Sequence, residues 1–253
     1  SGEAVKAIFW FEFGHRLLGR IIGLAFFLPF MFFLAARRLD RPLALRLTWL
    51  LALGALQGAV GWFMVKSGLI DRPSVSQYRL AMHLALAFLI YGALVWTIQG
   101  LRNAPDYGPA ETGLRRQRRI AGWLLALVSV TVVSGAFVAG LDAGHYYNTF
   151  PLMDGSLIPG DYQSGLPWWQ NPFENIAAVQ FHHRVLAVFT VVAALAFWLA
   201  NRGSHLTRQT RHAIRALAAM VLVQAGLGIV TLLNYVPVWL GALHQAGALV
   251  LFT

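Results

Sequence analysis

Seven apolar stretches fill most of this chain, and they decide what it can fold into. They lie at residues 15–36, 45–65, 78–99, 119–141, 178–200, 213–235 and 238–253. A helix of about 20 apolar residues crosses the hydrocarbon core of a bilayer, and all but the last stretch reach that length. Charged residues make up 12% of the chain, about half of their share in soluble domains. The sequence therefore predicts an all-α polytopic membrane protein that lies in a lipid bilayer.

The segments that connect the apolar stretches alternate in charge. Segments 37–46, 100–119 and 201–215 hold 13 of the 20 Lys and Arg residues. Segment 142–177, which we call the outer loop, has no Lys or Arg and carries four acids. Because basic loops stay in the cytoplasm, we expect the outer loop on the opposite side of the membrane.

Charge and cysteine content exclude several classes of function. The net charge of +10 is explained by arginines that set the topology, so we expect no nucleic acid partner. The chain has no cysteine, which excludes disulfides, thiolate metal sites and iron–sulfur clusters.

The chain contains an internal repeat. Three segments of the first half recur in the second half at offsets of 161 to 168 residues, and both copies run in the same direction through the membrane. We therefore expect two similar bundles related by an axis along the membrane normal. The matching segments are "FEFGHRLL" (11–18) with "VQFHHRVL" (179–186), "LQGAVG" (56–61) with "VQAGLG" (223–228), and "LAMHLALA" (80–87) with "GALHQAGA" (241–248).

The repeat predicts two pseudo-symmetric four-helix bundles. Residues 1–100 form the N-terminal half-bundle, and residues 101–253 form the C-terminal half-bundle, which includes the outer loop. A full repeat needs one more helix before residue 1, and the stretch 238–253 is short. We therefore expect the first helix to be missing and the last one to be truncated.

Four of the eight histidines occupy equivalent positions in the two copies, near the outer ends of their stretches: His15, His83, His183 and His244. One such histidine alone is more often a satisfied interfacial residue, but ionisable groups inside spans are costly and mark function. Imidazoles can bind copper or iron, and facing pairs in an apolar bundle best suit the iron of a bis-histidine heme. We pair His15 with His83 and His183 with His244.

Arginines accompany these histidines. Arg16 and Arg184 each follow a candidate ligand, and Arg20 lies one turn deeper than Arg16. Arginine pairs bidentately with carboxylates such as heme propionates, so we expect Arg16 and Arg20 at one heme and Arg184 at the other. The alternative is that these side chains extend to lipid headgroups.

Glu12 distinguishes the two copies, because its counterpart is Gln180. It lies three residues before His15, hence on the same face of a helix. A carboxylate in one site only suggests that this site performs chemistry and the other holds a fixed cofactor. The alternative is an ion pair between Glu12 and Arg16 at i,i+4.

Four motifs resemble the heme A synthase family, in its cysteine-free alphaproteobacterial and mitochondrial form. The resemblance covers nearly the whole chain. The motifs are "EFGHRLLGR" (12–20), "SGAFVAGLDAG…YNTFPLM" (134–153), "FHHR" (181–184) and "LHQ" (243–245).

This resemblance implies oxidation of the C8 methyl of heme O to a formyl group by successive hydroxylations, which yields heme A for cytochrome oxidase. It implies a heme b cofactor held by His183, His244 and Arg184. It places heme O, the substrate, at His15 and His83 with Arg16 and Arg20, and makes Glu12 the catalytic residue.

The resemblance also implies a cellular location and partners for the reaction. The chain lies in the bacterial inner (cytoplasmic) membrane with its heme sites toward the periplasm. A heme O-producing enzyme is the expected partner, an electron donor is required but not identified, and a homo-oligomer is compatible with the sequence.

Two other functions fit parts of the pattern. A diheme electron-transfer cytochrome would use the same histidine pairs, but both pairs lie on the outer side, whereas transfer across the membrane needs hemes at both depths. The difference between Glu12 and Gln180 also favours the enzyme. A transporter would show broken helices and polar residues near the midplane, whereas these stretches are polar mainly at the outer end.

Overall fold

The computed structural model describes the backbone of residues 2–71, 76–102, 114–204 and 206–253, and the side chains within them from residue 9 to 64 and from residue 76 onward. The described residues are almost entirely helical. The helices are α1 (Gly2–Ala35), α2 (Arg41–Asp71), α3 (Gln77–Arg102), α4 (Arg115–Gly140), α5 (Asn171–Glu174), α6 (Ile176–Ala200), α7 (Arg208–Leu233) and α8 (Val238–Phe252), with short 3₁₀ helices η2 (Ala143–His145) and η3 (Gly160–Tyr162).

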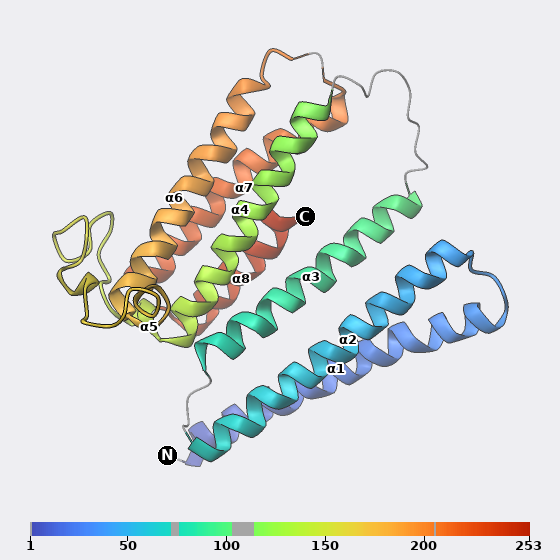
Figure 1. Cartoon of the computed structure of the whole chain (residues 1–253), viewed down its shortest axis with the longest axis horizontal. Coiled ribbons are helices and arrows are strands. Elements are labelled where there is room, and N and C mark those ends of the chain that lie inside the picture. The colour runs from blue at the N-terminus through green and yellow to red at the C-terminus, as the bar shows by residue number, and fades with distance from the viewer. Residues whose placement is uncertain (1, 72–75, 103–113, 205) are drawn as a thin grey trace.

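The long helices form a hairpin, a connecting helix and a bundle (Figure 1). Helices α1 and α2 make the hairpin, α3 packs beside α2 and α4, and α4, α6, α7 and α8 make the bundle. Within the bundle α4 packs on α6, α6 on α7, α7 on α8 and α8 on α4. The four helices therefore close a ring in which α6 and α8 are diagonal to each other.

The helices confirm the predicted polytopic membrane protein. Six of them are long and apolar enough to cross a bilayer, and α8 is a shorter apolar helix of 15 residues. Many of their large apolar side chains are exposed, as expected for surfaces that face lipid. The second half supplies four bundle helices, and the described part of the first half supplies α1, α2 and α3.

Helices α1 and α2 extend furthest beyond the apolar stretches that predicted them. Helix α1 begins at Gly2 and not near residue 15, and α2 continues to Asp71 and not to 65. A helix continues as long as its backbone hydrogen bonds are formed, so a polar sequence does not by itself end it. Glu12 is consequently inside a regular helix. The prediction that Glu12 and His15 share a helix face required this.

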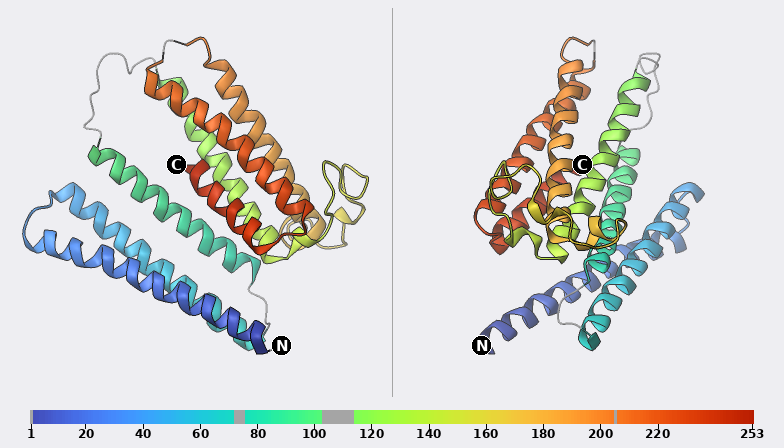
Figure 2. Two further views of the ribbon diagram at one scale, coloured as in Figure 1. Left: turned by 180° about the vertical axis from the view of Figure 1, so that it is seen from behind. Right: turned by 60° about the vertical axis from the view of Figure 1, so that its left-hand side comes forward.

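The outer loop lies against the end of the bundle where α6 begins (Figures 1 and 2). Asn175 connects the two. Its Oδ1 accepts hydrogen bonds from the backbone N–H groups of Ala177 and Ala178, which caps α6. Its Nδ2 donates to the carbonyls of Asp161 and Tyr162 in the loop. The start of α6 and the fold of the loop therefore depend on one side chain.

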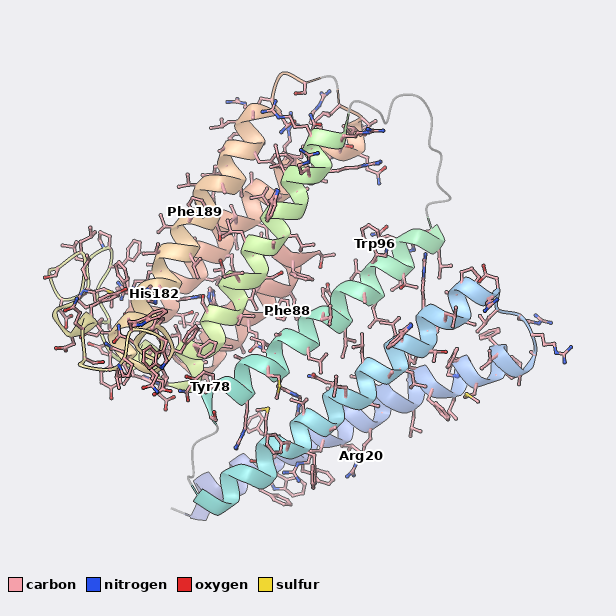
Figure 3. The ribbon with its side chains drawn as sticks, viewed as in Figure 1. Arg20, Tyr78, Phe88, Trp96, His182 and Phe189 are labelled. Carbon is pink, nitrogen blue, oxygen red and sulfur yellow. The ribbon has the colours of Figure 1, made fainter. Side chains whose placement is uncertain are left out.

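The two halves meet along α3. Phe88 of α3 packs edge-on against Phe252 of α8 at 5.3 Å between ring centroids, and Tyr78 packs on Phe137 of α4 at 5.5 Å. Figure 3 shows Tyr78 and Phe88 on α3, beside the bundle. A division of the chain into residues 1–100 and 101–253 stays a prediction, since residues 103–113 lie outside the described part.

Candidate heme sites

The first predicted histidine pair is brought together by α1 and α3. The ring centroids of His15 and His83 are 6.5 Å apart, with the ring planes at 73°. A metal–imidazole bond is about 2 Å long, so two imidazoles on one metal have centroids about 6 Å apart. The observed separation therefore fits a single iron between the rings. His15 is exposed and His83 is partly buried.

The second predicted pair comes from diagonal helices of the bundle. His183 is the eighth residue of α6 and His244 is the seventh residue of α8. Both helices start at the outer end of the bundle (Figure 2), so the two histidines lie at similar depth. Both side chains are partly buried.

Three of the four histidines pack against a glycine of the neighbouring helix. A Cβ atom built on each glycine would come within 2.9–3.1 Å of the Cε1 atom of the imidazole. That distance is closer than ordinary van der Waals contact, so these glycines leave the space in which the rings stand. The pairs are Gly61 with His83, Gly135 with His183, and Gly228 with His244.

Ser134, next to Gly135 on α4, fixes the proton of His183. Its Oγ lies 2.8 Å from Nδ1 of His183 and donates its hydroxyl proton to the carbonyl of Thr131 at 2.7 Å. When that one proton is donated to the carbonyl, Oγ is free to accept Nδ1–H from the imidazole. Nε2 of His183 is then unprotonated, which is the form that binds a metal.

Arg184 reaches the outer loop. Its Nη1 donates to the carbonyls of Thr149 and Leu152 at 2.8 and 3.4 Å, and its Nη2 donates to the carbonyl of Tyr147 and to Oε1 of Gln180. Its Nε is buried and has no hydrogen-bond partner in the described part of the chain. The two Nη groups therefore hold the "NTFPLM" stretch, and Nε is the donor that remains for a ligand.

Gln180 holds the beginning of the same loop. It is buried, and its Nε2 donates to the carbonyls of Ala143 and Tyr146, both at 2.6 Å. Its role in the structure is thus to connect α6 to the turn after α4. A carboxylate at this position could not donate either bond.

Glu12 and Arg16, the counterparts of Gln180 and Arg184, form an ion pair. Oε2 of Glu12 and Nη2 of Arg16 are 3.0 Å apart, and each side chain is slightly more than half exposed. The structure therefore contains the Glu12–Arg16 ion pair that the sequence offered as an alternative. Arg20 is exposed at the outer edge of the α1–α2 hairpin (Figure 3).

The remaining histidines lie apart from both pairs. Nε2 of His182 is 2.9 Å from the hydroxyl of Tyr162, so His182 faces the outer loop (Figure 3). His145 and His212 are exposed, and His205 is outside the described residues.

The donor set suits heme better than a metal held by protein alone. Among the described residues no group of three or more His, Cys, Asp or Glu side chains could hold a metal ion. Zinc sites usually have three or four such ligands, whereas heme iron needs only two axial ones.

Four residues that contact candidate ligands were not identified as site residues from the sequence. Ser134 and Gly135 contact His183, although the stretch that contains them was singled out only as a motif. Gln57 and Gln224 were recognised as a repeat pair, and both lie next to candidate ligands. In each case the signal was a small or polar residue in an apolar helix. The sequence alone does not reveal which residue such a side chain contacts.

Comparison with known proteins agrees with this arrangement. Residues 1–253 match the family model COX15-CtaA, described as a cytochrome oxidase assembly protein. The chain is 52% identical over 253 residues to the heme A synthase of Nitrosospira multiformis, covering all of this chain and 71% of that protein. It is 48% identical to the heme A synthases of Nitrosomonas eutropha, over 252 residues, and Parvibaculum lavamentivorans, over 254 residues. These cover 99% and 100% of this chain and 71% of each relative. The resemblance seen in the four motifs is confirmed, and the chain belongs to the COX15-CtaA family of cytochrome oxidase assembly proteins.

Proposed function

We propose that this protein is a heme A synthase, which oxidises the C8 methyl of heme O to a formyl group by successive hydroxylations. The observation that carries the proposal is the His15–His83 pair, whose rings are spaced for one iron and which has a carboxylate, Glu12, one turn away on α1. The relatives named heme A synthase align over essentially the whole chain. The product serves cytochrome oxidase, in agreement with the family description.

The substrate site is the one in the N-terminal half. His15 and His83 hold the iron of heme O. Arg16 and Arg20 are available to its propionates, because both side chains are exposed on α1 near His15. Guanidinium groups bind carboxylates bidentately, so these contacts fix the orientation of the porphyrin and with it the position of the C8 methyl.

The cofactor site is the one in the C-terminal bundle. The residues fit heme b, since His183 and His244 come from the two diagonal helices of the bundle and Oγ of Ser134 can accept Nδ1–H of His183, which would leave its Nε2 for iron. The free Nε of Arg184 is placed to donate to a propionate. Heme b bound there supplies one-electron redox chemistry. The protein supplies the two ligands, the space and the anchored outer loop.

Glu12 is proposed as the catalytic residue. Its carboxylate accepts a proton from the substrate or stabilises positive charge that develops at the methyl carbon. Arg16, 3.0 Å away, pairs with this carboxylate. In the C-terminal half the same position is an amide with both N–H groups engaged by the outer loop, so it offers no base.

The location and partners follow from the same arrangement. The arginine-rich ends of the helices lie on the cytoplasmic side of the bacterial inner membrane, and both histidine pairs lie toward the periplasm. A heme O-producing enzyme delivers the substrate within the bilayer, and a separate electron donor supplies electrons through the heme b site.

Pigment analysis tests this function. The protein is expressed in a host that makes heme O but lacks its own heme A synthase, and extracted hemes are separated by chromatography. Heme A is expected with this chain and is absent with an empty vector. A purified protein that contains heme but never yields heme A would instead be an electron-transfer cytochrome.

A further inference from the structure

A similar polar contact occurs at His83 and His244, in the two halves, although it reaches Nε2 of His83 and Nδ1 of His244. Nε2 of Gln57, on α2, donates to the backbone carbonyl of His83 at 3.2 Å and lies 3.3 Å from its Nε2. Nε2 of Gln224, on α7, donates to the backbone carbonyl of His244 at 2.8 Å and lies 3.2 Å from its Nδ1. One amide thus contacts both the main chain and the ring of a candidate ligand, twice in one molecule.

A glycine completes each contact. Gly61 follows Gln57 by four residues, and Gly228 follows Gln224 by four, so each lies on the same helix face as its glutamine. The Cε1 atoms of His83 and His244 stand against these glycines. Each ring is therefore bounded by an amide and by a helix surface without a side chain. We call this arrangement the Gln–Gly clamp.

Each clamp retains an unused acceptor. Oε1 of Gln57 and Oε1 of Gln224 are buried and have no hydrogen-bond partner in the part of the chain that the structure describes. A buried acceptor without a partner costs about 1–3 kcal/mol, so its presence at equivalent positions in both halves calls for a reason. Rotation about the soft terminal torsion of glutamine would bring Oε1, the acceptor, to the ring nitrogen that Nε2 contacts in this structure.

A histidine bound to iron through one ring nitrogen carries a proton on the other and donates it to a nearby acceptor. Building on the proposed heme A synthase function, we infer that Gln57 and Gln224 are positioning residues that accept this ring proton and fix the imidazole planes of His83 and His244. The clamp in the C-terminal half acts on the heme b cofactor. The clamp in the N-terminal half acts on the substrate heme.

The two clamps serve as controls for each other. Gln224→Met and Gln57→Met keep the side-chain length but remove both hydrogen bonds, and Gln209→Met changes an exposed glutamine at the start of α7. Each variant is purified, and three quantities are measured for each heme: low-spin electron paramagnetic resonance g values, midpoint potential, and rate of heme loss to apomyoglobin. None of these depends on turnover.

Gln224→Met is expected to shift the g values and potential of heme b and to weaken heme b retention by about 10- to 100-fold, with the heme in the N-terminal half unchanged. Gln57→Met is expected to do the reverse, and Gln209→Met to match the wild type. If Gln224→Met does not accumulate, Gln224→Asn, which withdraws the amide by one methylene, is expected to shift the heme b signals in the same way.

Two results would overturn the inference in different ways. A wild-type protein that binds no heme overturns the proposed function and the inference with it. A wild-type protein with both hemes, together with Gln224 and Gln57 variants whose spectra, potentials and heme loss match it, overturns the positioning role alone.

Discussion

Nη2 of Arg184 donates a 2.8 Å hydrogen bond to Oε1 of Gln180, one turn earlier on α6. Arg16 and Glu12 make the corresponding contact on α1 at 3.0 Å. The two halves therefore share the same pair geometry and differ in its chemistry and surroundings. On α6 the pair lies under the outer loop, whereas on α1 it is exposed.

Gln180→Glu is expected to destabilise the outer loop. The carboxylate loses two donated hydrogen bonds and faces the carbonyl oxygens of Ala143 and Tyr146, at a cost of about 2–4 kcal/mol. Thermal unfolding of the purified protein and proteolysis of residues 142–177 measure the effect. Glu12→Gln is the matched control, since loss of an exposed pair changes stability by less than about 1 kcal/mol.

Glu12→Gln is expected to abolish turnover while both hemes remain bound. The amide keeps the shape of the side chain and its contact with Arg16 but cannot accept a proton, and general-base catalysis contributes about 10²- to 10⁴-fold. Heme A yield and total heme content of the purified variant are measured together. Full heme A production by this variant would exclude a catalytic role for Glu12.

Gly228→Ala is expected to disturb the ligand of the cofactor site. The new Cβ would lie 2.9 Å from Cε1 of His244, so the ring must move. Gly226→Ala, two residues away on α7, is the matched control, because nothing lies within 4 Å of a Cβ there. Heme b content should fall in the first variant and stay at the wild-type level in the second. Equal heme content in both variants would show that the imidazole of His244 can move without loss of heme b.

Ser134→Ala is expected to weaken heme b binding by about 10-fold, because Nδ1–H of His183 loses its acceptor and the ring loses its fixed tautomer. Ser129→Ala on the same helix is the control, since Oγ of Ser129 bonds to the carbonyl of Leu125. Heme loss to apomyoglobin and the heme b midpoint potential are compared. A Ser134 variant that behaves like the Ser129 variant would remove Ser134 from the site.

The sequence was sufficient for the features that follow from repetition and hydropathy. Apolar length gave the spans, and the repeat indicated that the four histidines lie at similar depth, because equivalent helices place equivalent residues at equivalent depth. The 100° turn between neighbouring helical residues also explains why His182 faces the outer loop while His183 contacts α4. These predictions need only the geometry of a single helix and the symmetry between two copies.

Contacts between helices could not be predicted in the same way. The sequence indicated only that Gln180 replaces the acid of the other copy. In the structure its amide donates the hydrogen bonds that hold the outer loop. Arg184 looked like a propionate ligand only, yet its Nη groups bind loop carbonyls. Both partners lie more than 30 residues away in the chain and have no periodic signal, so only the folded arrangement reveals them.

The most direct test of two separate histidine pairs is the heme content of His83→Ala and His244→Ala, compared by pigment extraction and optical spectra with the wild type. His244→Ala should lose heme b while heme O remains bound at the other site. His83→Ala should keep heme b, bind no heme O and yield no heme A. Loss of both hemes to the same extent in each variant, or heme A production by His83→Ala, would contradict two independent bis-histidine sites with chemistry at the first.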